Sequence, residues 1–231
     1  MKITQRLTEI PKSCWQAESQ LMELDVWKNA GNDGDDWNNW WAGKFDNYSF
    51  LKNEDIKNIC EVGCGPYAKN IQFVTSVLNT KPINYFLNDP LLNEYINLDK
   101  SVKTFASQVQ ANINAEPLEE YTLEEKVDCI ICVNVLDHVY SLDKCFNSMY
   151  ANLKPNGILI LGQDLTNDYD FDVTPKEDPW AMMHPIRVDY NDIKPYLIQK
   201  YTPIFDKILP REESRASYNH YGTLLFAGKK I

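Results

Sequence analysis

Two glycines separated by one residue follow an acid at the end of a short apolar run, Ile59-Cys-Glu61-Val-Gly63-Cys-Gly65. A sharp turn from a buried strand into a helix needs positive φ or a missing Cβ, so that the backbone can approach a ligand closely. Glu61 lies at the carboxyl end of the expected strand, where open α/β sheets bind ligands, and an acid there suits ammonium or hydroxyl groups better than phosphate. The pattern favours an aminoacyl-nucleoside over a dinucleotide.

The three histidines of the chain are His138, His184 and His220. A histidine in a loop at the carboxyl ends of strands is the best candidate for a base, because its pKa lies near neutrality. His138 ends the segment Asn-Val-Leu-Asp-His after an apolar run, where its other possible role is to orient the loop. His184 begins His-Pro-Ile-Arg187-Val-Asp-Tyr190 in a polar stretch. We therefore take His138, His184 and Tyr190 as candidate catalytic residues. Arg187 could bind the carboxylate, phosphate or hydroxyl of an acceptor. A role in a structural ion pair fits the sequence equally well.

Aromatic residues gather near the N-terminus, at Trp37, Trp40, Trp41, Phe45 and Tyr48. Their amphipathic faces suit stacking on a sugar ring or covering a cofactor. The alternative is that they pack this segment onto a sheet. We expect packing for at least one tryptophan and ligand contact for another, with Trp41 as the candidate for acceptor binding.

These residues must be positioned by alternating short apolar runs and helix-like segments, the pattern of a parallel sheet with crossover helices. Helices are expected over 13–29, 68–78, 141–153 and 190–200, and strands over 58–62, 83–88, near 109–113, 127–133, 157–162, 202–208 and 221–227. The last two strands have no helix between them, so they must be antiparallel neighbours or nearly so. The expected fold is a doubly wound, mostly parallel α/β sheet of seven strands with an antiparallel terminal strand.

Length and composition are those of one globular domain. The chain has 231 residues, of which 44% are hydrophobic and 24% charged, and no apolar run is long enough to span a membrane. We expect a single domain over 1–231, with a helical, aromatic-rich cap at 1–55, a core at 56–231 and a substrate-wall insertion at about 164–190. No signal-peptide pattern is present, so a cytoplasmic location is expected. The net charge of −10 argues against a nucleic-acid substrate and is compatible with a small-molecule or sugar-like acceptor.

The six cysteines are expected to be reduced thiols, because four of them lie in or beside apolar stretches. Cys129 and Cys132 form a C-x-x-C pattern within an expected strand. Their side chains should therefore point to opposite faces of the sheet, which favours a core role over zinc binding. No metal site is predicted.

Five motifs in order make the chain resemble the class I S-adenosylmethionine-dependent methyltransferases. They are Glu61-Val-Gly63-Cys-Gly65, Asp89 at the end of the second strand, Ala115-Glu-Pro-Leu118 after the third, Asn134-Val-Leu-Asp-His138 after the fourth, and Leu153-Lys-Pro-Asn-Gly157 before the fifth. The resemblance covers residues 57–163 by motif and the rest by element order. It departs from the family at Pro66-Tyr67, where many members have a third glycine. Tyr67 is therefore expected at the ligand's edge or packed on the following helix.

The resemblance implies S-adenosylmethionine as cofactor, methyl transfer as reaction, and Asp89 as the residue that holds both ribose hydroxyls. The implied cofactor-binding residues are Glu61, Gly63, Cys64, Gly65, Asp89, Pro90, Glu116, Pro117, Asn134, Val135 and His138; the expected acceptor-binding residues are Trp41, Tyr67 and Arg187. Asp89 before Pro90 is also a good helix start, and both roles can hold together. Glu116 has an alternative role as a surface acid.

Two other functions remain compatible with parts of the sequence. Gly63-x-Gly65-x-x-Ala68, with Asp89 twenty-four residues after Gly65, also fits the dinucleotide fingerprint of NAD-dependent oxidoreductases. A catalytically silent relative that keeps the fold as a binding module is the other possibility. The motif after the fourth strand and the reversed strands at the end of the chain favour the methyltransferase. With an acidic chain and an aromatic cap, we expect O-methylation of a small polar metabolite or saccharide.

Overall fold

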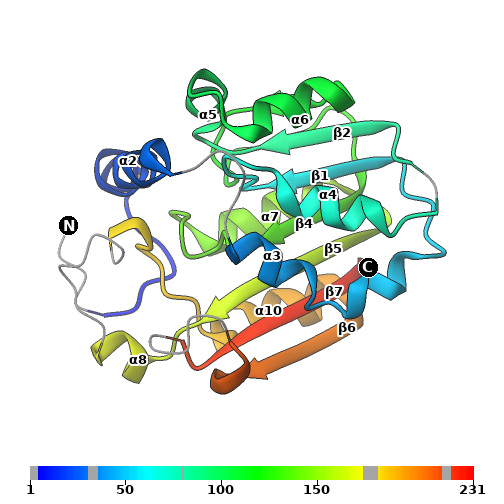
Figure 1. Cartoon of the computed structure of the whole chain (residues 1–231). Coiled ribbons are helices and arrows are strands. Elements are labelled where there is room, and N and C mark those ends of the chain that lie inside the picture. The colour runs from blue at the N-terminus through cyan, green and yellow to red at the C-terminus, as the bar shows by residue number, and fades with distance from the viewer. Residues whose placement is uncertain (1–4, 31–35, 80, 174–181, 215–219) are drawn as a thin grey trace.

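A seven-stranded sheet with the order β3-β2-β1-β4-β5-β7-β6 forms the centre of the protein (Figure 1). The structure is a computed structural model and describes residues 5–30, 36–79, 81–173, 182–214 and 220–231. The first five strands in this order, β3, β2, β1, β4 and β5, pair in parallel. Strand β7 runs antiparallel to both of its neighbours, β5 and β6. The predicted doubly wound, mostly parallel sheet is confirmed.

The elements lie close to their predicted positions. The strands are β1 (Asn58–Val62), β2 (Asn84–Asn88), β3 (Asn112–Asn114), β4 (Val127–Val133), β5 (Leu153–Leu165), β6 (Tyr201–Pro210) and β7 (Gly222–Lys230). The helices of the core are α4 (Lys69–Ser76), α5 (Leu92–Asn97), α6 (Ser101–Val109), α7 (Leu142–Asn152), α8 (Asp168–Val173) and α10 (Tyr190–Lys200), with a 3-10 turn, η3 (Arg211–Glu213). The third strand begins later than predicted, because α6 continues to Val109.

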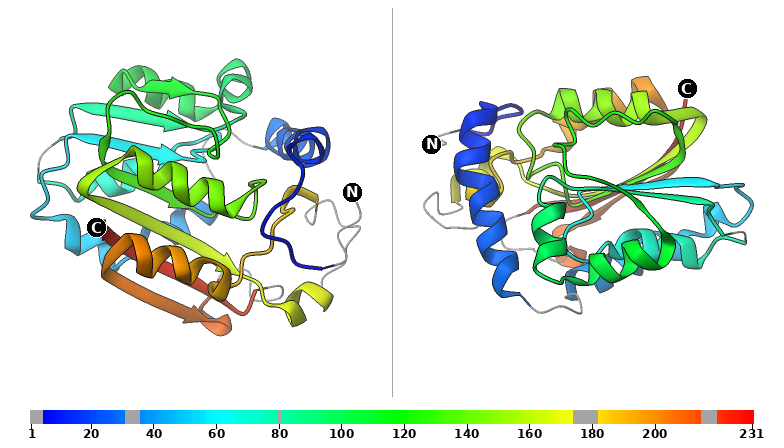
Figure 2. Two further views of the ribbon diagram at one scale, coloured as in Figure 1. Left: turned by 180° about the vertical axis from the view of Figure 1, so that it is seen from behind. Right: turned by 90° about the horizontal axis from the view of Figure 1, so that it is seen from above.

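Hydrophobic side chains cover both faces of the sheet. One cluster includes residues of α7 and α10, and the other includes residues of α4, α5 and α6. Figure 2 shows these helices on opposite sides of the sheet. Cys129 belongs to the second cluster and Cys132 to the first, as strand alternation predicts, and both are free thiols. The C-x-x-C pair therefore has a core role.

The N-terminal segment lies across the carboxyl ends of the parallel strands (Figure 2). The predicted helix over 13–29 is divided into α1 (Lys12–Cys14), a π-helical turn, η1 (Trp15–Ser19), and α2 (Gln20–Asn29). It is followed by α3 (Asp36–Ala42) and a 3-10 segment, η2 (Asp46–Leu51). The helices α1, η1 and α2 therefore face the carboxyl ends of the strands, which is where open α/β sheets bind their ligands.

Within the described parts of the chain, no helix is both long enough and apolar enough to cross a bilayer.

Candidate functional site

The two glycines of the turn after β1 have different surroundings. Both have positive φ, +59° at Gly63 and +57° at Gly65. A Cβ at Gly63 would lie 2.4 Å from a methyl carbon of Val135, whereas a Cβ at Gly65 would have no atom of the described part of the chain within 4 Å. Gly63 therefore allows the loop after β4 to pack on the turn. Gly65 leaves open space beside the backbone.

Asp89, at the end of β2, is joined to this turn. Its Oδ2 accepts a hydrogen bond from the Gly65 amide at 2.9 Å, and its Oδ1 accepts one from the Leu91 amide at 2.9 Å. The side chain is buried, and burial raises its pKa to about 6. The predicted helix start at Pro90 is wrong, because α5 begins at Leu92 without a side-chain cap, and the contact with Leu91 instead holds the turn before it. Each carboxylate oxygen keeps a further lone pair for a ligand hydroxyl.

Glu61 is buried beneath the turn, with 1% of its surface exposed. Its oxygens accept hydrogen bonds from the Asn70 side-chain amide and the Ile71 backbone amide, each at 2.9 Å. Burial raises its pKa to about 7. In this structure Glu61 connects the end of β1 to the start of α4, and its predicted contact with the cofactor stays a prediction.

Polar groups continue along the edge formed by β2, β3 and β4. The side-chain amide of Asn88 donates to the Glu116 carbonyl at 2.8 Å, which holds the loop of Glu116 and Pro117 beside β2. Glu116 is exposed, and Pro90 and Pro117 are partly buried. After β4, Asn134 has a φ of +56°, and its buried Oδ1 has no hydrogen-bond partner among the described residues. An unpartnered buried acceptor is a place where a ligand donor can bind.

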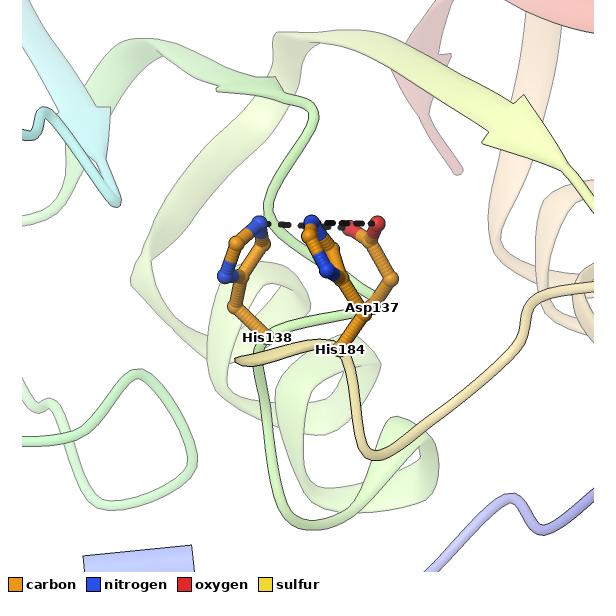
Figure 3. A group of neighbouring side chains, drawn as sticks. All are labelled: Asp137, His138 and His184. Carbon is orange, nitrogen blue, oxygen red and sulfur yellow. Dashed lines mark ion pairs between the residues drawn. The ribbon is translucent and has the colours of Figure 1, made fainter. Parts of the chain in front are cut away.

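Three of the side chains at this edge form a compact cluster, Asp137, His138 and His184 (Figure 3). Nε2 of His184 lies 3.7 Å from Oδ2 of Asp137, and Nε2 of His138 lies 4.0 Å from Oδ1. The two imidazole rings have centroids 4.2 Å apart. The structure therefore brings together the two predicted catalytic histidines, which are 46 residues apart in sequence (184 − 138).

Carboxylates control the charge of this cluster. Burial lowers the pKa of His138, but the charges of Glu23 and Asp137 and the hydrogen bond with Glu23 outweigh burial and raise the pKa to about 9. Burial likewise opposes ionisation of Glu23 and Asp137, and their histidine neighbours nevertheless hold both pKa values below the usual range. Asp89 contributes to the raised pKa of His138, so the cluster and the end of β2 are electrostatically coupled.

Two residues that sequence reasoning missed position the cluster. Glu23, from α2, has Oε2 at 2.6 Å from Nδ1 of His138, and its Oε1 accepts from the Trp27 indole at 2.6 Å. Gln163, in β5, donates to Oδ1 of Asp137 at 3.1 Å. The spacing of Glu23 and Trp27 allows a contact on one helix face, but nothing in the sequence pairs Glu23 with His138, which is 115 positions away.

The predicted acceptor-binding aromatics are packed into the protein. Trp41 is 3% exposed, and a Cβ on Gly162 would lie 2.6 Å from its ring, so it packs directly on β5. Tyr67 is also 3% exposed, and its ring meets that of Trp27 edge-on, with centroids 5.6 Å apart. Tyr67 thus joins the turn to α2. The side chain of Trp37 lies outside the described residues.

Arg187 and Tyr190 have different surroundings. Arg187 is buried, its carbonyl accepts a hydrogen bond from Arg6 at 3.0 Å, and its charge helps to lower the pKa of His220, although burial is the main cause. Tyr190 begins α10, with its ring 5.8 Å from Nζ of Lys194. Burial and the charge of Asp206 raise the pKa of Tyr190. None of the described interactions joins Tyr190 to the histidine cluster.

The family model described as a methyltransferase domain matches residues 41–196. The chain belongs to this methyltransferase family. The matched region contains the glycine turn, Asp89, Asn134 and the histidine cluster. No curated protein matches the chain significantly.

Solved structures place the methyltransferase among proteins of the same fold. N-methyltransferase NodS from Bradyrhizobium japonicum, in complex with S-adenosyl-L-homocysteine, is 12% identical, with a TM-score of 0.62 over 94% of this chain and 98% of that chain. The 1,6-didemethyltoxoflavin-N1-methyltransferase of Burkholderia thailandensis is 14% identical, with a TM-score of 0.56 over 85% and 81%. The [4+2]-cyclase SpnF is 10% identical, with a TM-score of 0.66 over 99% of both chains. At these identities the likeness establishes the fold.

The cofactor of this family is S-adenosylmethionine, and the site residues of the methyltransferase fit it. The open space at Gly65, the carboxylate of Asp89 and the unpartnered Oδ1 of Asn134 offer room, a hydroxyl acceptor and an ammonium acceptor along one edge. The bound cofactor supplies an activated methyl group.

Proposed function

We propose that the protein transfers a methyl group from S-adenosylmethionine to an oxygen atom of a small polar metabolite or sugar-like molecule. The observation that carries the proposal is the cluster of Asp137, His138 and His184; the first two lie on the loop after β4, which contacts the glycine turn through Val135. Proton-accepting groups therefore lie next to the place where the cofactor residues converge. Methyl transfer to a hydroxyl needs such a group, because the hydroxyl must lose its proton.

The proposed reaction assigns separate roles to the cofactor-binding residues and to the two histidines. Gly63, Gly65, Asp89 and Asn134 hold the cofactor and fix its orientation, which supplies most of the rate enhancement in a displacement between aligned groups. His184 is the better candidate for the base. The other histidine, His138, has one ring nitrogen at Glu23 and the other facing Asp137, an arrangement that retains a proton and orients the loop.

Oxygen and nitrogen acceptors can be separated by product analysis. The protein, incubated with S-adenosylmethionine carrying a labelled methyl group and fractionated metabolite pools, should label a small polar product with an ether- or ester-linked methyl group. Two of the similar structures are N-methyltransferases, so a labelled amine would keep methyl transfer but reject the oxygen acceptor. No label transfer to any pool, with cofactor binding intact, would identify a catalytically silent module.

The base is tested by a pair of variants. His184→Gln should lower kcat by about 100-fold or more if His184 removes the acceptor's proton. The matched control is His220→Gln, since His220 is paired with Thr166 at 3.0 Å and lies outside the cluster. Equal effects of the two substitutions on kcat would remove His184 from its proposed role.

A further inference from the structure

We propose that Asp137, His138 and His184 bind a divalent transition-metal ion. Each residue offers one donor atom, and the three atoms lie within 4.8 Å of one another. Donors bound to one ion at about 2.1 Å lie about 3–3.5 Å apart in tetrahedral or octahedral geometry. The Nε2 atoms of His184 and His138 lie 3.7 and 4.0 Å from different oxygens of Asp137, so the three donors, now within 4.8 Å of one another, must move together by up to about 1–2 Å to bind one ion.

The surroundings of the cluster resemble a prepared ligand set. A histidine that binds a metal through one nitrogen usually gives its other N–H to a carboxylate, which fixes the ring. His138 meets this condition, because Glu23 holds Nδ1 at 2.6 Å and Nε2 faces Asp137. Gln163 holds Asp137 by a hydrogen bond to Oδ1. Asp137 and His138, the two proposed metal ligands on the loop after β4, are thus each oriented by a hydrogen bond with a neighbouring side chain.

The cluster is also fixed in place and accessible. The Ile186 amide donates to the Asp137 carbonyl at 3.3 Å, which joins the loop after β4 to the segment of His184. The Trp15 indole donates to the His138 carbonyl at 2.6 Å. The side chains of Asp137, His138 and His184 are 5%, 20% and 14% exposed, so the site is mostly shielded but not closed.

The donor set selects the class of ion. Two imidazoles and one carboxylate suit Zn²⁺, Mn²⁺, Fe²⁺ or Co²⁺, whereas Mg²⁺ and Ca²⁺ prefer oxygen ligands alone. Three protein ligands leave positions free for solvent or an acceptor. The catalytic consequence rests on the proposed function: in the metal-loaded protein His184 is a ligand and not the base, and the ion lowers the pKa of the acceptor hydroxyl. The hydroxyl proton then leaves to water, the oxygen forms the bond to the methyl carbon, and the sulfur keeps the electrons of the broken bond.

The test is a metal titration of the full chain, purified without a histidine tag and treated with chelator. Zn²⁺ and Mn²⁺ binding is followed by calorimetry, and Co²⁺ binding by its visible spectrum. One ion should bind per chain, and the Co²⁺ spectrum should lack a thiolate charge-transfer band. Glu23→Gln should weaken binding by about 10- to 100-fold, as loss of an outer partner does elsewhere. His184→Gln should weaken it further, and His220→Gln should not.

Three results would overturn the site: no saturable binding of any of the three ions, a thiolate band that places Co²⁺ on cysteines, or unchanged binding in His184→Gln. Because a cluster variant can fail to fold, the wild-type protein provides a second measurement. Metal should protect His138 and His184 from modification by diethyl pyrocarbonate, and unprotected histidines would also reject the site. Binding of S-adenosylhomocysteine is measured in parallel, so loss of cofactor binding with metal binding intact would count against the proposed function alone.

Discussion

Gly63 and Gly65 have the same backbone conformation but support different properties of the site. Alanine at either position costs about 1–2 kcal/mol, because a Cβ strains the left-handed region. Gly63→Ala should cost about 1–3 kcal/mol more, since its Cβ would collide with Val135. Gly65→Ala places its methyl group in the open space where we expect the cofactor.

The expected outcome is therefore a crossover between the two alanine variants. Thermal unfolding should show Gly63→Ala to be the less stable protein. Calorimetry with S-adenosylhomocysteine should show that Gly65→Ala, although better folded, loses more affinity than its stability loss explains. Normal binding by Gly65→Ala would mean that the cofactor lies elsewhere.

Asp89→Asn should weaken S-adenosylhomocysteine binding by about 10- to 100-fold, because it removes charge-assisted hydrogen bonds of about 1.5–3 kcal/mol to the ribose. Asn keeps one side-chain oxygen for the amides of Gly65 or Leu91. Asp99→Asn is the control, since Asp99 is exposed and its carboxylate pairs with Lys103. If both variants bind like wild type, Asp89 does not hold the ribose.

Glu61 gives the protein a defined pH dependence. Its folded-state pKa of about 7 lies above the ordinary value of 4.5, because burial opposes ionisation. The folded state therefore binds more protons than the unfolded state between these values, and stability should fall as pH rises from about 4.5 to 7. Glu61→Gln loses one acceptor for Asn70 or Ile71, so it should be less stable at low pH but show a flatter profile. If the melting temperatures of the two proteins changed by the same amount between pH 4.5 and 7.5, this account would be contradicted.

Site residues close to a motif could be predicted from the sequence, whereas partners from distant elements could not. The glycine turn, Asp89 and the loop of His138 follow from strand ends and spacing. Glu23 and Gln163 contact the cluster only because α2 crosses the sheet edge and β5 lies beside β4. Trp41 packs on Gly162 and so supports the core, and its predicted contact with the acceptor stays a prediction.

At the level of elements, Arg6 is one of several contacts that attach the N-terminal segment to the core. Its guanidinium contacts Asp168 of α8 and Asp192 of α10, each at 2.6 Å, and donates to the Arg187 carbonyl. Arg6 is mostly shielded, with 15% of its side chain exposed. One planar group thus joins three segments, which a lysine ammonium would not reproduce with the same geometry.

Arg6→Ala should loosen the segment that carries Glu23. We expect faster proteolytic cleavage within residues 5–30 and weaker S-adenosylhomocysteine binding by about 3- to 10-fold, with global unfolding changed by no more than about 1 kcal/mol. Lys12→Ala is the matched control, because Lys12 forms an exposed ion pair with Glu120 and should have little effect. Equal cleavage rates for wild type and Arg6→Ala would reject this attachment.

The boundaries of most elements follow from hydrophobic pattern, and the exceptions have physical causes. The run Val127–Val133 was predicted as a strand and forms β4. In contrast, β5 extends from Leu153 to Leu165. Its first residue pairs with Val127 of β4 and its last three pair with β7, which local sequence does not reveal. The predicted N-terminal helix is divided by a π-helical turn at Trp15–Ser19, where Trp15 is buried against Tyr140.

At the scale of the whole molecule, the sheet places every cofactor-binding candidate except Glu61 in loops or strand ends at one edge. The order β3-β2-β1-β4 puts Asp89, the glycine turn and Asn134 side by side. The N-terminal segment adds Glu23, which contacts His138 at the same edge. A methyl donor with a ribose and an amino-acid end fits three observations: the family membership, the open turn and the carboxylate of Asp89.

The central claim is that S-adenosylmethionine binds at this edge, and titration with S-adenosylhomocysteine tests it most directly. We predict one binding event per chain by calorimetry and a higher melting temperature, with no comparable effect of NAD or NADH. Absence of both heat and a thermal shift with S-adenosylhomocysteine, or stabilisation by NAD(H) in its place, would contradict the assignment.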